Sequence, residues 1–352
     1  MKSTTTPQSI STDRRRIEAV TRLDVQYLHS DKLPFALAES GAHPMAVMSF
    51  GHTIPDPVPC PTIRLDLTQF DGPPLVEVWT SDKPVTMREI AGCSMAMTDD
   101  VLIGSICLDE QSGVSLDATT YAGYRDLLQQ LRLLGYPHLW RVWNYFPCIN
   151  DHQDGLERYR RFCVGRHQAL TESMIDFPVS LPAATAVGTR SGPLQIVFLA
   201  GAQPATHLGN PRQLNAYEYP SDYGPRSPSF ARATFTRAEH DIRLYIAGTA
   251  SIVGHTSRHS GLPMEQTRET IRNLHTVLNH AKHVTGVDLM QSQRRALYKV
   301  YVREPHSLPD IRLALQDSPL STHQLVFLEG DLCRRELLME IEGLILTELF
   351  PS

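Results

Sequence analysis

Lysine is scarce in this chain of 352 residues, whereas arginine is abundant. The sequence contains 33 lysine and arginine residues, and five of them are lysines, at positions 2, 32, 83, 282 and 299. Codon bias alone would produce the same excess, so the excess does not itself indicate a function. It does make arginine the expected partner of any carboxylate substrate, because a planar guanidinium pairs with a carboxylate through two parallel hydrogen bonds.

The signature motifs of several enzyme classes are also missing. The sequence has no GxGxxG after a strand, no GxxxxGK[ST], no HExxH and no GxSxG, so nucleotide-dependent, zinc-hydrolase and serine-esterase chemistry have no support. His255 and His259 are four residues apart, as in a helical metal site, but the neighbouring Gly254 and Gly261 indicate a loop. We therefore expect neither a cofactor nor a metal ion.

Charge, cysteine content and hydropathy exclude several cellular roles. The formal net charge of −5 gives no general attraction to nucleic acid or to an anionic membrane, and no apolar run has the length of a membrane span. The six cysteines are far apart and form no CxxC pair, which is typical of reduced thiols in a cytoplasmic protein. Residues 1–20 are polar, lack the apolar core of a signal peptide, and are expected to be a disordered leader.

The rest of the chain predicts strand, helix and strand in that order, twice. Apolar runs and helical periodicity place a strand at 101–108, a helix from about 119 that ends at Gly135, a strand at 139–147, then a strand at 242–255, a helix at 264–284 and a strand at 296–305. A short helix and two strands close the chain, and Pro-rich stretches in the first third favour loops and edge strands. This pattern indicates an α+β fold, with helices packed on one face of mixed sheets.

A stretch without periodicity, residues 181–192, is the expected domain boundary. It would separate an N-terminal α+β domain at 21–185 from a C-terminal domain at 190–352. The segment 208–234 also lacks a regular pattern. Loops of this length in a compact domain are usually functional, so we expect this one to contribute to a site.

The closing strand contains two carboxylates. In LLMEIEGLIL, alternation along the strand sends Leu338, Glu340 and Glu342 to one face. Taken alone, the pattern favours an exposed edge strand whose charged face lies in water. If the strand is buried instead, a carboxylate flanked by Leu, Met and Ile would have a raised pKa and could act as an acid at neutral pH.

Five segments in the same order resemble the chorismatases. They are NYFPCIN (144–150), ERYRRFCVGRHQAL (157–170), YGPRSPSFARAT (223–234), GTASIVGH (248–255) and DLCRRELLMEIEG (331–343). The helix region GLPMEQTRETIRNLHTVL and the closing strand also resemble the YjgF/RidA superfamily. The resemblance implies a RidA-like body with a pseudo-threefold arrangement inside one chain, acting as a monomer. Only two of its three units are visible in the sequence.

The resemblance also implies a substrate and residues that bind it. Chorismatases convert chorismate, a dianion, with loss of pyruvate, so each carboxylate needs a cation. Arg166 and Arg226, each inside a matching segment, are the expected binders, with the phenol groups of Tyr159, Tyr219 and Tyr223 fixing orientation. For each tyrosine the alternative is a packed ring whose hydroxyl is satisfied within the protein.

The expected catalytic residues are Glu340 and Cys333. Glu340 would protonate the enolpyruvyl methylene carbon, a poor proton acceptor that requires a well-placed, protonated acid; Glu342 is the alternative acid. By the resemblance, a cysteine seven residues before that glutamate, together with the small residue Gly248, marks chorismatases that form 3-hydroxybenzoate. The alternative for Cys333 is a packed core thiol.

Three other functions remain open at this point. The chain could hydrolyse chorismate to a dihydroxycyclohexadiene carboxylate and pyruvate, or release both 3- and 4-hydroxybenzoate. It could also be a RidA-like module that binds or processes small molecules without acting on chorismate.

Overall fold

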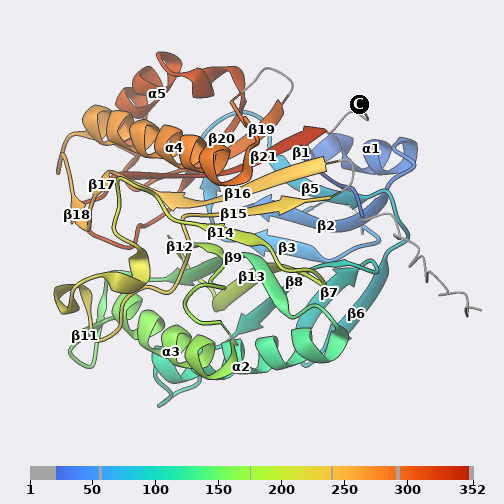
Figure 1. The fold of residues 1–352 in the computed structure, drawn as a ribbon, viewed down its shortest axis with the longest axis horizontal. Coiled ribbons are helices and arrows are strands. Elements are labelled where there is room, and N and C mark those ends of the chain that lie inside the picture. Colours follow the sequence, from blue (N-terminus) through green and yellow to red (C-terminus); the bar gives the residue numbers. More distant parts are fainter. Residues whose placement is uncertain (1–20, 55–57, 175, 239–240, 291–293, 349–352) are drawn as a thin grey trace, which may run out of the picture.

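Three mixed β-sheets and their helices make up the computed structural model, which describes residues 21–54, 58–174, 176–238, 241–290 and 294–348 (Figure 1). The leader expected at residues 1–20 lies outside the described residues. None of the described helices combines the length and apolar character needed to cross a bilayer.

The first unit is a four-stranded sheet in the order β1-β5-β2-β3. Its elements are β1 (Leu23–His29), α1 (Leu33–Glu39), β2 (His43–Phe50), β3 (Thr62–Leu65) and β5 (Leu75–Ser81). Helix α1 was not predicted. The Pro-rich segment before β5 was expected to form loops or an edge strand, but β5 is an interior strand. Pro73 and Pro74 precede it and therefore leave its ladder of hydrogen bonds intact.

The second unit is a six-stranded sheet in the order β12-β9-β13-β8-β7-β6. Its elements are β6 (Thr86–Ile90), β7 (Cys93–Met97), β8 (Val101–Leu108), α2 (Leu116–Leu134), β9 (His138–Pro147), α3 (Arg158–Ser173), β12 (Ala183–Thr189) and β13 (Leu194–Gly201). The predicted strand–helix–strand order is confirmed here, and Gly135 ends α2 in the left-handed conformation at φ 90°. The stretch 181–192, expected to be a domain boundary, contains β12, and β12 and β13 both pair with β9.

The third unit is built around the order β14-β15-β16-β21-β19-β20, to which β4 (Thr68–Gln69) adds an edge. Its elements are β14 (Thr206–Leu208), β15 (Ala233–Arg237), β16 (Asp241–Thr249), α4 (Pro263–Thr285), β19 (Arg294–Val302), α5 (Leu308–Gln316), β20 (Gln324–Glu329) and β21 (Met339–Glu348). Two short hairpins, β10 (His152–Gln153) with β11 (Leu156–Glu157) and β17 (Ile252–Val253) with β18 (Thr256–Ser257), lie in the connections.

All three units share one connectivity. In each, a strand leads through a helix to a second strand, and a third strand then pairs parallel to the second, as β2–β3, β9–β12 and β19–β20. The last strand of each unit, β5, β13 or β21, lies antiparallel between the first and second. The expected threefold arrangement within one chain is therefore confirmed. The N-terminal unit is the one that the sequence pattern did not reveal.

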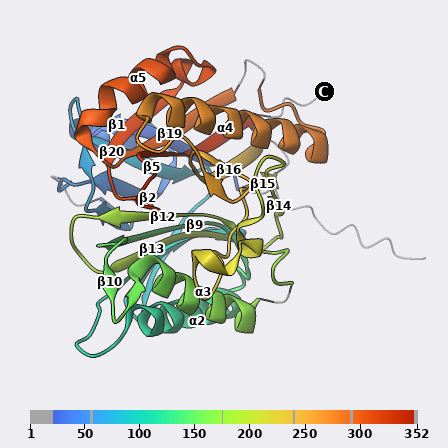
Figure 2. The ribbon, with the colours of Figure 1, turned by 90° about the vertical axis from the view of Figure 1, so that its left-hand side faces the viewer.

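The sheets face one another, and the larger helices lie outside them. Figure 2 shows α4 and α5 over the sheet of the third unit and α2 and α3 over that of the second. The buried cluster between the sheets includes Trp79, Trp143, Tyr145 and Tyr301. Because the inner faces of all three units meet there, residues far apart in sequence come together at their junctions.

Candidate active site

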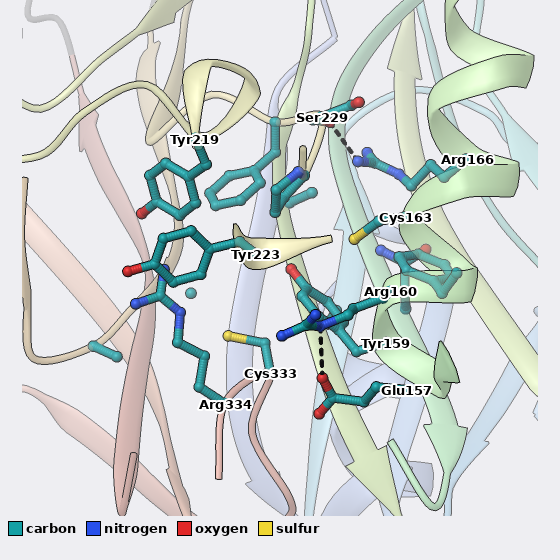
Figure 3. Close-up of a pocket in the computed structure, with 18 of the residues that line it drawn as sticks. Glu157, Tyr159, Arg160, Cys163, Arg166, Tyr219, Tyr223, Ser229, Cys333 and Arg334 are labelled. Carbon is teal, nitrogen blue, oxygen red and sulfur yellow. Dashed lines mark hydrogen bonds and ion pairs between the residues drawn. The ribbon is translucent and has the colours of Figure 1, made fainter. Parts of the chain in front are cut away.

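A cavity of about 420 Å³ lies between the second and third units (Figure 3). It is lined by the start of α3, the middle of β12, the segment 219–232, the end of β16, and the loop and strand from 333 to 340. The long segment 208–234, predicted to be functional because it lacked periodicity, supplies one wall. Each of the five segments that resemble chorismatases contributes at least one lining residue.

Helix α3 presents three lining residues at the spacing of one helical face. Tyr159, Cys163 and Arg166 are at i, i+4 and i+7, and Figure 3 shows them projecting from the same helix. Arg166 is buried. Its Nε donates to the Tyr124 hydroxyl at 2.9 Å, and its Nη1 donates to the carbonyl of Ser229. Its Nη2 is buried and has no hydrogen-bond partner within the described part of the chain, so it can donate a hydrogen bond to a bound anion.

The opposite wall contains two of the predicted tyrosines. The Tyr219 hydroxyl accepts a 2.7 Å hydrogen bond from Nη2 of Arg232, and the Tyr223 hydroxyl lies 3.1 Å from Nδ1 of His255. The Arg334 guanidinium lies 4.2 Å from the centre of the Tyr223 ring, which is cation–π geometry. Figure 3 shows Tyr219, Tyr223 and Arg334 together on the side of the cavity facing α3.

Arg226 does not line the cavity, and Arg232 from the same segment does. The Arg226 side chain is exposed, on a stretch between Pro225 and Pro228. Burial, and next the charge of Arg226, lower the pKa of His167. Arg232 is buried, and its Nε has no partner among the described residues. In the sequence, Arg232 follows Phe230 by two residues and comes directly before β15, which favours a buried side chain. The prolines on both sides of Arg226 favour an exposed turn.

Three further arginines line the cavity that the sequence reasoning did not select. Arg160 pairs with Glu157 at 3.2 Å, and Arg334 and Arg335 stand beside Cys333. All three lie inside the segments 157–170 and 331–343 that resemble chorismatases. Their closeness in sequence to Tyr159 and Cys333 could have indicated that they line the same site. The lining also contains the carboxyl groups of Glu157, Asp222, Glu336 and Glu340, so its five arginines give it a moderate excess of positive charge, which suits an anionic substrate.

Glu340 lies on β21 with its carboxyl at the cavity and is only 5% exposed. Burial, and next the charge of Glu342, raise the pKa of this carboxyl to about 8. No hydrogen bond reaches its oxygens from any described residue. Gly248 makes room for it, because a Cβ at that position would lie 2.0 Å from a Glu340 oxygen. A carboxyl with this pKa is mostly protonated at neutral pH. The exposed edge strand that the pattern alone favoured does not form, because β21 lies between β16 and β19.

Glu342 lies on the same face of β21 but does not line the cavity. Its carboxylate receives Nη2 of Arg141 at 2.7 Å, Nζ of Lys299 at 3.1 Å and the indole N–H of Trp143 at 2.8 Å. Lys299 and Arg141 hold the pKa of Glu342 below its usual range despite its burial. Glu342 is therefore an ionised carboxylate and cannot donate a proton.

Cys333 lines the cavity on the loop before β21. Burial, with a further contribution from Glu340, raises the pKa of its thiol to about 12, so the sulfur carries its proton at neutral pH. Cys163 on α3 also lines the cavity, and burial raises the pKa of its thiol to about 12. All six cysteines are free thiols.

Two side chains fix the loop that carries Cys333. Arg303, just after β19, donates to the backbone carbonyls of Leu332, Arg334 and Leu337 at 2.8–3.0 Å and to the carboxylate of Asp331 at 2.6 Å. The buried amide of Gln266 on α4 donates to the carbonyl of Glu336 at 2.8 Å and accepts from the amide of Leu338 at 2.8 Å. The Gln-containing helix noted in the sequence therefore holds the loop that leads into Glu340.

We expect Arg303→Ala to lower both stability and turnover. Loss of these charge-assisted hydrogen bonds should cost about 2–4 kcal/mol of unfolding free energy, because several carbonyls lose their partner at once. Turnover should fall further than unfolding explains, because Cys333 and Glu340 are displaced. Chemical denaturation and turnover at a temperature where the variant is folded measure the two effects. Arg237→Ala, a change at the exposed end of β15, is the control, and unaltered turnover in Arg303→Ala would contradict the expectation.

The histidines excluded as metal ligands have other contacts. His255 lies against Tyr223, and Nε2 of His259 is 3.7 Å from Glu269. Among the described residues, no group of three or more His, Cys, Asp or Glu side chains is arranged to hold a metal ion.

Comparison with known proteins identifies the family. The FkbO/Hyg5-like chorismatase N-terminal domain matches residues 77–200. A chorismatase from Streptomyces hygroscopicus is 38% identical over 324 residues, which covers 90% of this chain and 91% of that protein. The chain belongs to the chorismatase family. A 3-hydroxybenzoate synthase from the same organism is 33% identical and covers 81% of this chain, with 86% of its own length matched.

A solved chorismatase has the same fold. Its crystal structure superposes with a TM-score of 0.80 at 35% identity, over 93% of this chain and 98% of that one. The similarity therefore extends over all three units. The predicted family and the predicted α+β fold with three units in one chain are confirmed.

Proposed function

We propose that this chorismatase converts chorismate into 3-hydroxybenzoate and pyruvate. The observation that supports this most strongly is a buried carboxyl, Glu340, in a cavity lined by five described arginines, where burial raises its pKa to about 8. Its curated relatives bear the names chorismatase and 3-hydroxybenzoate synthase. The cavity volume of about 420 Å³ is in the range of small-molecule sites.

The unpartnered nitrogens of Arg166 and Arg232 are the proposed carboxylate binders. They approach from α3 and from the facing loop, so two carboxylates at opposite ends of one substrate can be bound at the same time. A buried guanidinium nitrogen without a partner is costly, and a bound carboxylate removes that cost. Tyr159, Tyr219 and Tyr223 are proposed to orient the ring between the two arginines.

Glu340 is proposed to transfer its proton to the methylene carbon of the enolpyruvyl group. The carbon adjacent to the ether oxygen then becomes an oxocarbenium-like centre, and the bond between the ether oxygen and the ring breaks as pyruvate forms. The resulting carboxylate is stabilised by nearby Arg141, Arg232 and Arg303, each of which lowers the pKa of Glu340. The acid is thus neutral before the transfer, and cations are in place for the charge that the transfer creates.

The fate of the ring distinguishes rearrangement from hydrolysis. Forming 3-hydroxybenzoate and pyruvate consumes no net water, whereas hydrolysis to the dihydroxycyclohexadiene carboxylate consumes one water molecule. We propose that the hydroxyl on the neighbouring ring carbon closes onto the carbon cation left by the ether oxygen and loses its proton, which gives an arene oxide. The Cys333 thiol, close enough to Glu340 for their charges to interact, relays that proton back to the Glu340 carboxylate before water reaches the ring. The oxide then opens with its oxygen on the former cation carbon, and the hydrogen of that carbon leaves as a proton while the oxygen gains one, which gives 3-hydroxybenzoate. Hydrolysis is the second candidate, because the cavity is open to solvent and water can enter it.

Incubating the protein with chorismate tests the proposed function. Pyruvate is measured with a coupled assay, and the second product is identified by chromatography against 3-hydroxybenzoate, 4-hydroxybenzoate and the dihydroxy acid. Equal amounts of pyruvate and 3-hydroxybenzoate are expected. Absence of pyruvate would instead favour a RidA-like module that binds small molecules without acting on chorismate.

We also propose that the enzyme acts as a cytoplasmic monomer. The six free thiols suit a reducing compartment. The three units that a symmetric trimer would supply from three chains are present in one chain here, so the cavity between two of them needs no second copy. Light scattering would measure the mass in solution.

The rate of pyruvate release should decrease above about pH 8. Because the pKa of Glu340 is raised to about 8, its proton is present below that pH and is lost as the pH rises through it. Above that point kcat/KM should fall about tenfold per pH unit. Cys333→Ala should keep the same alkaline limb, since the thiol titrates far above it. A rate that stays constant well above pH 8 would contradict the role of Glu340.

A further inference from the structure

Beneath the cavity, four buried charged side chains meet at the junction of all three units. Glu77 comes from β5, Arg141 from β9, Lys299 from β19 and Glu342 from β21. Each is less than 5% exposed. Nζ of Lys299 is 2.7 Å from Glu77 and 3.1 Å from Glu342, which in turn is 2.7 Å from Nη2 of Arg141. Their charges cancel, so the cluster as a whole is neutral.

Glu342 connects this cluster to Glu340. The two glutamates are i and i+2 on one strand, so their Cα atoms are roughly 6–7 Å apart and both side chains point to the inner face. Both are buried, and water screens the interaction between them little. Three donors hold Glu342 as a carboxylate, whereas no donor from the described residues reaches Glu340. A negative charge is therefore fixed beside an acid that has to stay neutral.

Glu342 also neutralises a cation that would otherwise act on Glu340. Arg141 pairs with Glu342 and donates to Thr185, whose hydroxyl accepts from the Gly248 amide at 3.0 Å. Without Glu342, the uncompensated charge of Arg141 would favour the ionised form of Glu340. The charged or titratable groups that face Glu340 from the elements packed around it are Arg141, Tyr159, Arg232, Arg303, Cys333 and Glu342. Of these, Glu342 is the one held as an anion.

We propose that Glu342 is a positioning residue that keeps the Glu340 carboxyl protonated through its own fixed negative charge. This inference rests on the proposed function, since it concerns the acid of that reaction. It assigns the buried cluster a role in catalysis as well as in holding the three units together. Burial alone would favour a neutral Glu340, but three nearby arginines oppose it, and Glu342 offsets them.

The test is a titration of Glu340 in the full chain without substrate. Protein labelled with ¹³C at the glutamate side-chain carboxyl is followed by NMR as the pH changes, and the Glu340 signal is assigned by its loss in Glu340→Gln. The wild-type midpoint is expected near 8. In Glu342→Gln it should fall by about one pH unit or more, because a like charge is removed and Arg141 is left unpaired. The alkaline limb of kcat/KM should move by the same amount.

Glu77→Gln is the matched control. It removes the same charge from the same cluster and also takes one partner from Lys299, but Glu77 is bound to Lys299 and Trp79 rather than placed beside Glu340. The Glu340 midpoint should therefore stay within a few tenths of a unit of wild type. An unchanged midpoint in folded Glu342→Gln would overturn the proposal, and so would equal shifts in both variants, which would indicate a general loss of the cluster.

A second variant covers the case in which Glu342→Gln does not fold. The double variant Glu342→Gln with Lys299→Met removes one anion and one cation, so the remaining pair of Glu77 and Arg141 is again neutral. Its Glu340 midpoint should also fall, and an unchanged midpoint would overturn the proposal. Because the titration uses no chorismate, its outcome is independent of the turnover assay. Absence of wild-type turnover would contradict the proposed function, and absence of the shift in the Glu340 midpoint would contradict this inference.

Discussion

Glu340→Gln is expected to reduce pyruvate release from chorismate by roughly 10³-fold, with the chain still folded. Glutamine has nearly the same shape as the protonated acid and fits the space that Gly248 leaves. It cannot give up a proton to a carbon atom. Because the wild-type carboxyl is already neutral at physiological pH, the substitution changes little in the charge of the free enzyme. Chorismate binding, measured by calorimetry, should therefore be nearly unchanged while kcat falls.

Glu336→Gln is the control for this result. Glu336 also lines the cavity but is exposed, and its carboxylate accepts a hydrogen bond from Ser257. The same chemical change at that site should leave turnover within a few-fold of wild type. Pyruvate release at the wild-type rate in Glu340→Gln would eliminate Glu340 as the acid. Glu342 could not replace it, since that carboxylate is ionised and does not line the cavity.

Cys333→Ala is expected to change the product rather than the rate of the first step. Protonation depends on Glu340, so pyruvate release should remain within about tenfold of wild type. Without the thiol, water can reach the ring intermediate, and the dihydroxycyclohexadiene carboxylate should replace 3-hydroxybenzoate as the main product. Chromatography of the products gives their ratio, and pyruvate measured in the same sample gives the rate of the first step.

Cys163→Ala is the matched control for the thiol. Cys163 lines the same cavity and its thiol is equally protonated, but it lies on α3 rather than on the loop beside Glu340. Its loss should leave 3-hydroxybenzoate as the main product. Full retention of 3-hydroxybenzoate formation in Cys333→Ala would contradict the proposed role of Cys333 and leave it as a packed thiol.

Local patterns predicted the strand–helix–strand core of the second unit and most elements of the third, but not helix α3. The apolar runs at β8 and β9, the face of α2 and its terminal Gly135 all depend on neighbours in sequence, which a single chain displays directly. The first unit was missed because its helix is short and has one buried residue, and because prolines obscure the start of β5. The pairing of β13 with β8 and β9 spans most of a unit and leaves no local signal, so the sequence did not show that the stretch 181–192 lies within a sheet.

The site was predictable to the same extent. Glu340, Cys333, Gly248, Arg166 and the three tyrosines line one cavity, as expected from the segments in which they lie. The sequence predicted Arg226 as a lining residue, but Arg232 lines the cavity instead. Both belong to one segment, and only the path of the backbone decides which of them is buried. Arg303 and the partners of Glu342 were missed for another reason. Arg303 binds mainly carbonyls, and the partners of Glu342 lie on another strand and another unit.

The fusion of three units into one chain allows the buried charges at the junction to differ from one unit to the next. On a true threefold axis every residue occurs three times, so a buried carboxylate there would face two copies of itself. Here Glu77, Arg141 and Lys299 come from three units of different sequence, and together with Glu342 they form a neutral set. One anion, Glu342, can therefore lie beside Glu340 without the same arrangement being repeated at the other junctions.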